Sequence, residues 1–211
     1  MAAWSLGGAV APVAAAADPV TIAALGDSLT HGYGLPPDQG FVPQLQAWLR
    51  AQGLDVTVLN AGVSGDTTAG GLARLDWTLT PEVDALIVEL GANDFLRGID
   101  PAAARANLDA ILTRAGEAGI PVLLVGLPAP ANYGPDYQQQ FDAIWPDLAA
   151  MHGTLLVADF FRGLVPPGTD PAAERAVVMQ PDGIHPNAQG VARIVADIGP
   201  EVAALVARVQ P

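Results

Sequence analysis

The sequence predicts an α/β protein, a three-layer α/β/α sandwich around a five-stranded parallel sheet of flavodoxin-like strand order 2-1-3-4-5. Short, continuous apolar runs alternate along the chain with segments of helical period, which is the pattern of parallel strands buried on both faces. The 211 residues are 51% hydrophobic and only 15% charged, which suits one domain with a sizeable core. No internal repeat or low-complexity linker interrupts residues 18–211, so we expect them to form a single domain.

Each predicted strand is a short apolar run bounded by turn-forming residues. In chain order, the five strands are expected at residues 20–25, 56–59, 85–90, 122–127 and 154–158. Between them, apolar residues recur every three or four positions, which predicts helices at residues 41–51, 68–79, 101–118 and 137–151. A last helix is predicted at residues 187–209, with one apolar face formed by Val191, Ile194, Val195, Ile198, Val202, Leu205, Val206 and Val209. We expect Gly199-Pro200 to kink or split this helix, because proline removes a helical hydrogen bond.

Residues 1–17 carry no charge and are rich in alanine, and three alanines, residues 14–16, precede Ala17-Asp18. Small residues in this place are typical of a signal-peptide cleavage site, although the basic segment that usually opens a signal peptide is missing. We therefore expect a signal-peptide-like segment at residues 1–17 and a periplasmic or secreted protein. The alternative is a frayed, alanine-rich tail on a cytoplasmic protein. The segment is too short and too weakly apolar to span a bilayer, so no stable membrane anchor is expected.

The charge and composition exclude several classes of function. The net charge is −13 and all nine basic residues are arginine, so a nucleic-acid partner is not expected. Because lysine and cysteine are absent from the sequence, there is no Walker lysine, Schiff-base lysine, thiol nucleophile or thiolate metal site. No metal-binding or dinucleotide motif is present, so we expect neither a metal nor a cofactor. The expected partner is a small-molecule substrate, and the expected assembly is a monomer or a weak dimer.

The first predicted strand runs into Gly26-Asp27-Ser28-Leu29, where the backbone turns toward a helix. A serine at this point has its hydroxyl in the crevice above the sheet. Its own N–H is among the free donors of a helix start, where negative charge is favoured. Ser28 is therefore a candidate nucleophile and a candidate oxyanion donor. The alternative is that Ser28 only caps the helix, as serine before a helix usually does.

In the predicted strand order the chain reverses between strands 1 and 3, and ligands bind at such a point outside the carboxyl ends of the strands. Two further loops begin there. In the first, glycine lets the Gly65 N–H approach a ligand closely. In the second, the Asn93 amide is a neutral donor for an oxyanion. The alternatives are a plain turn with a helix cap at Asp66 or Thr67, and an Asn/Asp turn at Asn93.

The segment Gln180-Pro181-Asp182-Gly183-Ile184-His185-Pro186 carries an acid and a base three residues apart. Proline favours the first position of a helix, so the loop is expected to end at Pro186. The His185 imidazole can then lie over the crevice, with the Asp182 carboxylate orienting its ring. The alternative is a turn former at Asp182 followed by a histidine at a helix start.

The remaining histidines and serines suit other roles. His152 precedes a glycine at a predicted helix end, where both residue types are ordinary. His31 has no carboxylate at short spacing, Ser5 lies in the signal-like segment, and Ser64 has no better claim on a base than Ser28. Elimination leaves Ser28 paired with His185.

Four of these stretches, in this order, resemble the sequence blocks of the GDSL, or SGNH, hydrolase family. They are Gly26-Asp27-Ser28-Leu29, residues 62–67, Gly91-Ala92-Asn93-Asp94 and Asp182-Gly183-Ile184-His185-Pro186. Together they span nearly all of the chain after Asp18. Residues 64–67, 88–98 and 130–134 also resemble the TesA-like branch of bacterial acyl-CoA thioesterases, lysophospholipases and arylesterases.

The resemblance implies the SGNH hydrolase fold and a serine hydrolase that needs no cofactor. It implies the nucleophile Ser28, the base His185 and the orienting carboxylate Asp182, with oxyanion donors at the Ser28 N–H, the Gly65 N–H and the Asn93 side chain. It also implies substrate contacts, at Asp27, Leu29, Asp94, Phe95, Pro130 and Ile184. The branch is typically periplasmic. Residues 127–129 depart from its pattern, at a loop that borders the acyl site in the branch.

We therefore predict a GDSL-type carboxylic ester hydrolase that cleaves esters and thioesters through an acyl-enzyme. Aryl esters and short-to-medium acyl esters with an uncharged body are the expected good substrates, because acyl-CoA is an anion and the protein is acidic. One alternative is a carbohydrate O-deacetylase on the same fold. Another is a non-catalytic ligand-binding module, and a flavin- or nucleotide-binding protein of similar topology is a weaker third.

Overall fold

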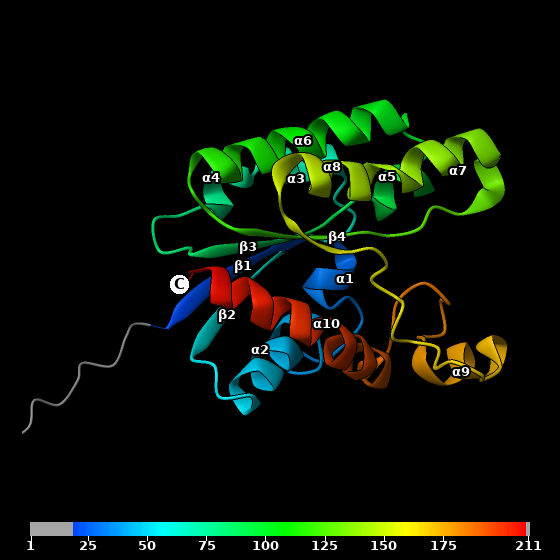
Figure 1. Cartoon of the computed structure of the whole chain (residues 1–211). Coiled ribbons are helices and arrows are strands. Elements are labelled where there is room, and N and C mark those ends of the chain that lie inside the picture. Colours follow the sequence, from blue (N-terminus) through cyan, green and yellow to red (C-terminus); the bar gives the residue numbers. More distant parts are fainter. Residues whose placement is uncertain (1–18, 210–211) are drawn as a thin grey trace, which may run out of the picture.

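The computed structural model describes residues 19–209, which form a parallel five-stranded sheet between two layers of helices (Figure 1). The strand order is β2-β1-β3-β4-β5, as predicted. The strands are β1 (Val20–Gly26), β2 (Val56–Gly62), β3 (Ala85–Glu89), β4 (Val122–Val125) and β5 (Leu155–Val157). All four strand pairings are parallel. The signal-like segment at residues 1–17 lies outside the described residues.

Helices cover both faces of the sheet. On one face α10 packs against α2, and on the other α6 packs against α3 and α8 (Figure 1). In chain order the helices are α1 (Ser28–His31), α2 (Phe41–Ala51), α3 (Thr68–Ala73), α4 (Leu75–Thr78), α5 (Ala92–Leu96), α6 (Pro101–Glu117), α7 (Pro135–Asp142), α8 (Ile144–His152), α9 (Pro171–Val178) and α10 (Ala188–Val209), with a 3₁₀ turn at Ala131–Tyr133.

Two of the predicted helices are each divided in two. The segment 68–79 breaks at Arg74, whose guanidinium turns inward to bond the Gly26 and Ala61 carbonyls. The segment 137–151 breaks at Ala143 and already begins at Pro135. The break fits Pro146, which has no N–H to donate to the carbonyl four residues earlier.

The last helix does not split at Gly199-Pro200, contrary to that part of the prediction. Gly199 is buried, and a side chain there would clash with the ring of Trp48, whereas Pro200 faces solvent. Helix α10 therefore continues because its apolar face stays packed on both sides of the proline. Of the eight apolar residues predicted on that face, all but Val209 are buried, and Val209 is partly buried against the core.

The three loops that carry the candidate site begin at the same edge of the sheet. At the end of β1, Gly26 is in register with Gly62 of β2 on one side and with Glu89 of β3 on the other. The carboxyl ends of these strands therefore meet at one place. This is the point where the chain reverses direction across the sheet, as the strand order predicts.

Candidate active site

Ser28 is the first residue of α1, directly after β1. The cap of this short helix is Asp27, whose carboxylate accepts a hydrogen bond from the Leu29 N–H at 3.0 Å. The serine side chain is thus left free by the cap, and the alternative of Ser28 as a capping residue is wrong. The preceding turn needs glycine, because a Cβ at Gly26 would lie 2.0 Å from the Thr30 hydroxyl oxygen.

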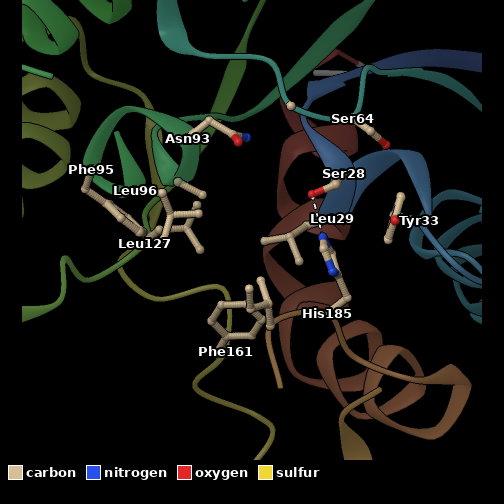
Figure 2. Close-up of a pocket in the computed structure, with 13 residues that line it drawn as sticks. Ser28, Leu29, Tyr33, Ser64, Asn93, Phe95, Leu96, Leu127, Phe161 and His185 are labelled. Carbon is tan, nitrogen blue, oxygen red and sulfur yellow. Dashed lines mark hydrogen bonds between the residues drawn. The ribbon is translucent and has the colours of Figure 1, made fainter. Parts of the chain in front are cut away.

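His185 lies beside the serine (Figure 2), although the two are 157 residues apart in sequence. Its Nε2 is 2.8 Å from the Ser28 Oγ, and its Nδ1 is 2.7 Å from Asp182 Oδ2. The other carboxylate oxygen of Asp182 accepts hydrogen bonds from the His185 and Ile184 backbone N–H groups. These bonds, above all those from His185, lower the pKa of Asp182 to about 2. The carboxylate is therefore ionised across the working pH range and fixes the orientation of the imidazole.

Gly65 lies at the bend of a tight turn after β2. The Asp66 N–H donates to the Val63 carbonyl at 3.0 Å, and Gly65 has φ +86°, a conformation that favours glycine. The Gly65 carbonyl accepts a 2.7 Å hydrogen bond from Arg97 at the end of α5. Gly65 lines the cavity that also contains Ser28 and His185. Thr67 caps α3 by accepting a hydrogen bond from the Gly70 N–H, so this loop contains both the glycine turn and a cap.

Asn93 is on α5 and points toward Ser28 across the cavity (Figure 2). One of its amide hydrogens is donated to Asp27 Oδ2 at 3.0 Å. The Asp27 carboxylate thus holds the first turn of α1 with one oxygen and the Asn93 amide with the other. Within residues 19–209, the bond to Asp27 is the one hydrogen bond that the Asn93 side chain makes.

The cavity has a volume of about 310 Å³ and mostly apolar walls. Figure 2 shows Phe95, Leu96 and Leu127 together on one side, with Phe161 below them and Tyr33 beside His185. The full lining is Ser28, Leu29, Tyr33, Ser64, Gly65, Ala92, Asn93, Phe95, Leu96, Leu127, Phe161, Ile184 and His185. An apolar chamber with a few polar groups at one end suits a substrate with a hydrocarbon part and one reacting polar group.

Three of the six residues expected to contact substrate line this cavity, namely Leu29, Phe95 and Ile184. The other three do not. Asp27 and Asp94 are fully buried and face protein groups, and Pro130 is exposed outside the cavity. Asp94 accepts hydrogen bonds from the Thr68 N–H and hydroxyl, so it fastens α5 to α3. The carboxylates of Asp27 and Asp94 point into the protein and hold the loops in place. The direction of a side chain is not visible in the sequence.

His31 and His152 are not among the residues that line the cavity. His31 Nδ1 is 3.1 Å from the Gly62 carbonyl, beside β2. His152 ends α8 next to Gly153 and pairs with Asp109 at 2.6 Å. The structural roles expected for His152 and its glycine are confirmed. Among residues 19–209, there is no group of three or more His, Asp or Glu side chains that could hold a metal ion.

Sequence reasoning missed several residues of this region. Tyr33 and Phe161 line the cavity, and Glu89 lies beneath it, fully buried at the end of β3. The signal for Phe161 was available, since two adjacent phenylalanines follow the last strand at the edge where the loops meet. No comparable signal marks Tyr33. No helix within the described part of the chain is long and apolar enough to cross a membrane.

Two buried carboxyl groups lie behind the serine. Burial raises the pKa of Asp27 to about 6, against the hydrogen bonds from Leu29 and Asn93. Burial, and then the charge of Asp27, raise the pKa of Glu89 well above its usual range. Thr30 donates to one Glu89 oxygen at 2.8 Å, and the other oxygen is buried without a protein partner in the described residues. An unpaired charge in that position is costly, which favours the neutral form of Glu89.

Replacing Glu89 by glutamine is expected to make stability less dependent on pH. The folded protein keeps the Glu89 proton at pH values where the unfolded chain has lost it. The free energy of unfolding therefore falls as pH rises above the ordinary glutamate pKa of 4.5. Glutamine has no proton to lose and can still accept from Thr30. Thermal unfolding measures the Tm of the Glu89→Gln variant and of the unaltered protein at each pH. We expect the variant's Tm to gain on that of the unaltered protein between about pH 5 and about pH 8. A constant or falling difference would contradict a neutral Glu89.

Comparison with known proteins agrees with this geometry. Residues 24–193 match the GDSL-like Lipase/Acylhydrolase family. The chain is 40% identical to esterase TesA of Pseudomonas aeruginosa over 187 residues, 88% of this chain and 89% of that protein. It is 38% identical to thioesterase 1/protease 1/lysophospholipase L1 of Escherichia coli K12, covering 82% of this chain and 78% of that protein.

Among solved structures, the fold is similar to that of AlinE4, an esterase of the SGNH-hydrolase family. The TM-score is 0.71 at 41% identity, over 89% of this chain and 97% of that one. Both the fold and the family predicted from the sequence are confirmed. This chain belongs to the GDSL-like lipase/acylhydrolase family of enzymes.

Proposed function

We propose that this protein hydrolyses carboxylic esters and thioesters through an acyl-enzyme formed on Ser28. The observation that carries the proposal is the continuous hydrogen-bonded row from the Ser28 Oγ to His185 and on to Asp182, at 2.8 and 2.7 Å. A hydroxyl within this distance of an imidazole that a carboxylate orients is the arrangement of an activated serine nucleophile.

In the first half of the reaction, the Ser28 Oγ attacks the acyl carbonyl carbon while His185 Nε2 takes the hydroxyl proton. The carbonyl oxygen becomes an oxyanion, for which the Ser28 N–H, the Gly65 N–H and the Asn93 amide are the proposed donors. Collapse of this intermediate breaks the bond to the alcohol or thiol, which leaves with the proton held on His185. The ionised Asp182 stabilises the imidazolium in between.

In the second half, water takes the place of the departed alcohol. His185 accepts a proton from this water as it attacks the acyl carbon of Ser28, and the same donors hold the new oxyanion. When the second intermediate collapses, the acid is released and the proton returns to the Ser28 Oγ. Every proton that moves is thus carried by His185.

The cavity supports a short-to-medium acyl chain as the part of the substrate that is bound. Its volume of about 310 Å³ is near the lower end for ligand pockets, about 300–1,000 Å³. Its walls are apolar, with Phe95, Leu127 and Phe161 around the chamber. A net charge of −13 disfavours an anionic leaving group such as coenzyme A, so an uncharged alcohol or phenol is the preferred leaving group.

A single substrate panel tests this proposal. We expect turnover of p-nitrophenyl esters and of neutral thioesters, with kcat/KM highest for short-to-medium chains and lower for acyl-CoA of the same chain length. The acyl-CoA penalty should shrink as salt is added, because screening weakens repulsion between like charges. Acetylated xylan belongs in the same panel, and a clear preference for it would indicate a carbohydrate deacetylase instead. No turnover and no burst with any activated ester would contradict the proposal.

We also propose that the mature protein is periplasmic or secreted. This proposal is supported by the uncharged, alanine-rich segment at residues 1–17, with its small residues before Asp18. Mass spectrometry of the protein from its native host should find an N-terminus near Asp18. An intact Met1 would contradict export with cleavage.

A further inference from the structure

The loop at residues 180–186 carries both Asp182 and His185, yet much of it stands in solvent. Residues 181–184 are exposed, and only Pro186 at its end is buried. His185 Nε2 and Ser28 Oγ are 2.8 Å apart, although the two residues are 157 positions apart in sequence. This distance therefore depends on the contacts that hold the loop against the segment that follows α1. The fastening is concentrated on one side chain, that of Gln180.

Gln180 uses its backbone and side chain to close the loop on itself. Its N–H donates to the His185 carbonyl at 2.8 Å, and its carbonyl accepts from the Gly183 N–H at 3.0 Å. Its Nε2 donates to the Pro186 carbonyl at 3.0 Å. Gly183, His185 and Pro186 are thus all hydrogen-bonded to the one glutamine.

The second amide hydrogen of Gln180 crosses from this loop to the serine side of the site. It is donated to the Tyr33 carbonyl at 2.8 Å, over a sequence separation of 147 residues. The Tyr33 N–H in turn donates to the Ser28 carbonyl at 3.0 Å. The Tyr33 ring also lies against the His185 ring, with centroids 4.7 Å apart. A closed ring of contacts therefore joins Gln180, Tyr33, Ser28 and His185.

The neighbouring backbone is shaped to admit this side chain. Gly34 has φ +74°, and a Cβ added there would lie 2.3 Å from Gln180 Oε1. Glycine suits this positive φ and leaves room for the Gln180 amide beside the Tyr33 carbonyl. Gln180 is not among the residues that line the cavity, so it has no direct contact to offer a substrate.

We propose that Gln180 is a positioning residue, which holds the His185 loop in register with Ser28 by bridging the Tyr33 and Pro186 carbonyls. The inference rests on the proposed function, since it concerns the same serine and histidine. Its physical basis is that misplacing a reacting group by about 1 Å can cost about 10²-fold in rate. Both amide hydrogens of Gln180 are donated, one to the Tyr33 carbonyl and one to the Pro186 carbonyl. A side chain that cannot donate two hydrogen bonds therefore weakens the link between the His185 loop and the Ser28 side of the site.

Three variants test the proposal. Gln180→Met keeps the length of the side chain without a donor, and Gln180→Asn keeps the amide on a shorter stem. Gln46→Met is the matched control, because Gln46 Oε1 accepts from the Val58 N–H at 2.9 Å in a link between α2 and β2, away from the cavity. For Gln180→Met we expect kcat on a p-nitrophenyl ester to fall about 10- to 10²-fold, while KM changes little. Gln180→Asn should be intermediate, and Gln46→Met should lose Tm but not kcat.

A second readout reports the serine–histidine geometry itself. The rate of Ser28 phosphonylation by an uncharged organophosphonate should fall in parallel with kcat in the Gln180 variants, because that reaction also needs His185 to take the serine proton. All rates are measured well below the Tm of each variant. If Gln180→Met does not fold, Gln180→Asn carries the same comparison.

The outcomes separate the two claims. An unaltered protein that neither turns over esters nor is labelled at Ser28 would end the proposed function. An active unaltered protein, with Gln180→Met retaining kcat and labelling rate to within about twofold, would overturn the role of Gln180 alone. That role is also overturned if Gln46→Met loses kcat to the same extent, because the loss would then report stability and not position.

Discussion

Replacing Ser28 by alanine is expected to lower kcat for ester hydrolysis by about 10⁶-fold, the typical cost of removing a triad nucleophile. Without the Oγ, no acyl-enzyme forms, and His185 has no hydroxyl at 2.8 Å from which to take a proton. What remains in the proposed mechanism is the binding of the ester in the apolar cavity and the proposed oxyanion donors, the Gly65 N–H and the Asn93 amide among them. Steady-state rates with a p-nitrophenyl ester measure the loss, and mass spectrometry measures whether an organophosphonate still labels the protein.

Ser64→Ala is the matched control for that experiment. Ser64 also lines the cavity, and it is the other serine among residues 19–209. It sits within the glycine turn after β2, and we expect its loss to leave both kcat and the labelled site nearly unchanged. A protein that loses activity with Ser64→Ala but keeps it with Ser28→Ala would move the nucleophile to the turn. Both changes remove one hydroxyl from the lining of the same cavity, so a loss confined to Ser28→Ala reports the nucleophile.

The fold was readable from the sequence because its three central strands, β1, β3 and β4, are almost entirely buried on both faces. Such strands appear as unbroken apolar runs, and the runs at residues 85–90 and 122–127 stand out between long segments of helical period. The parallel order then places the ends of β1, β2 and β3 side by side, so that three loops far apart in sequence meet at one edge. Strand ends were harder to predict. Strand β2 continues three residues past its predicted end, because Asn60, Ala61 and Gly62 still pair with β1.

The polar residues at the site divide into those that face the cavity and those that hold its walls, and sequence does not separate them. Asp27 and Asp94 belong to the same motifs as Ser28 and Asn93, but their carboxylates point inward to backbone and side-chain donors. The direction of each carboxylate depends on the backbone conformation at the preceding glycines, Gly26 and Gly91, and no pattern of residue types encodes that conformation. Gln180 stayed without a role for a related reason, since its partner Tyr33 is 147 residues away.

Replacing Asn93 by alanine is expected to lower kcat by about 10²- to 10³-fold, or about 3 kcal/mol of transition-state stabilisation. Its amide is held by Asp27 at 3.0 Å through one hydrogen, so the proposed donor is in position before the reaction starts. An oxyanion exists only along the reaction path, which is why KM should change little.

Asn107→Ala is the control for this prediction. It removes another asparagine whose amide donates to a side chain, that of Thr68, which does not line the cavity. It should reduce Tm without a comparable loss of kcat. Steady-state kinetics on one aryl ester compares the two variants, and an Asn93→Ala enzyme with an unaltered kcat would remove Asn93 from the oxyanion hole.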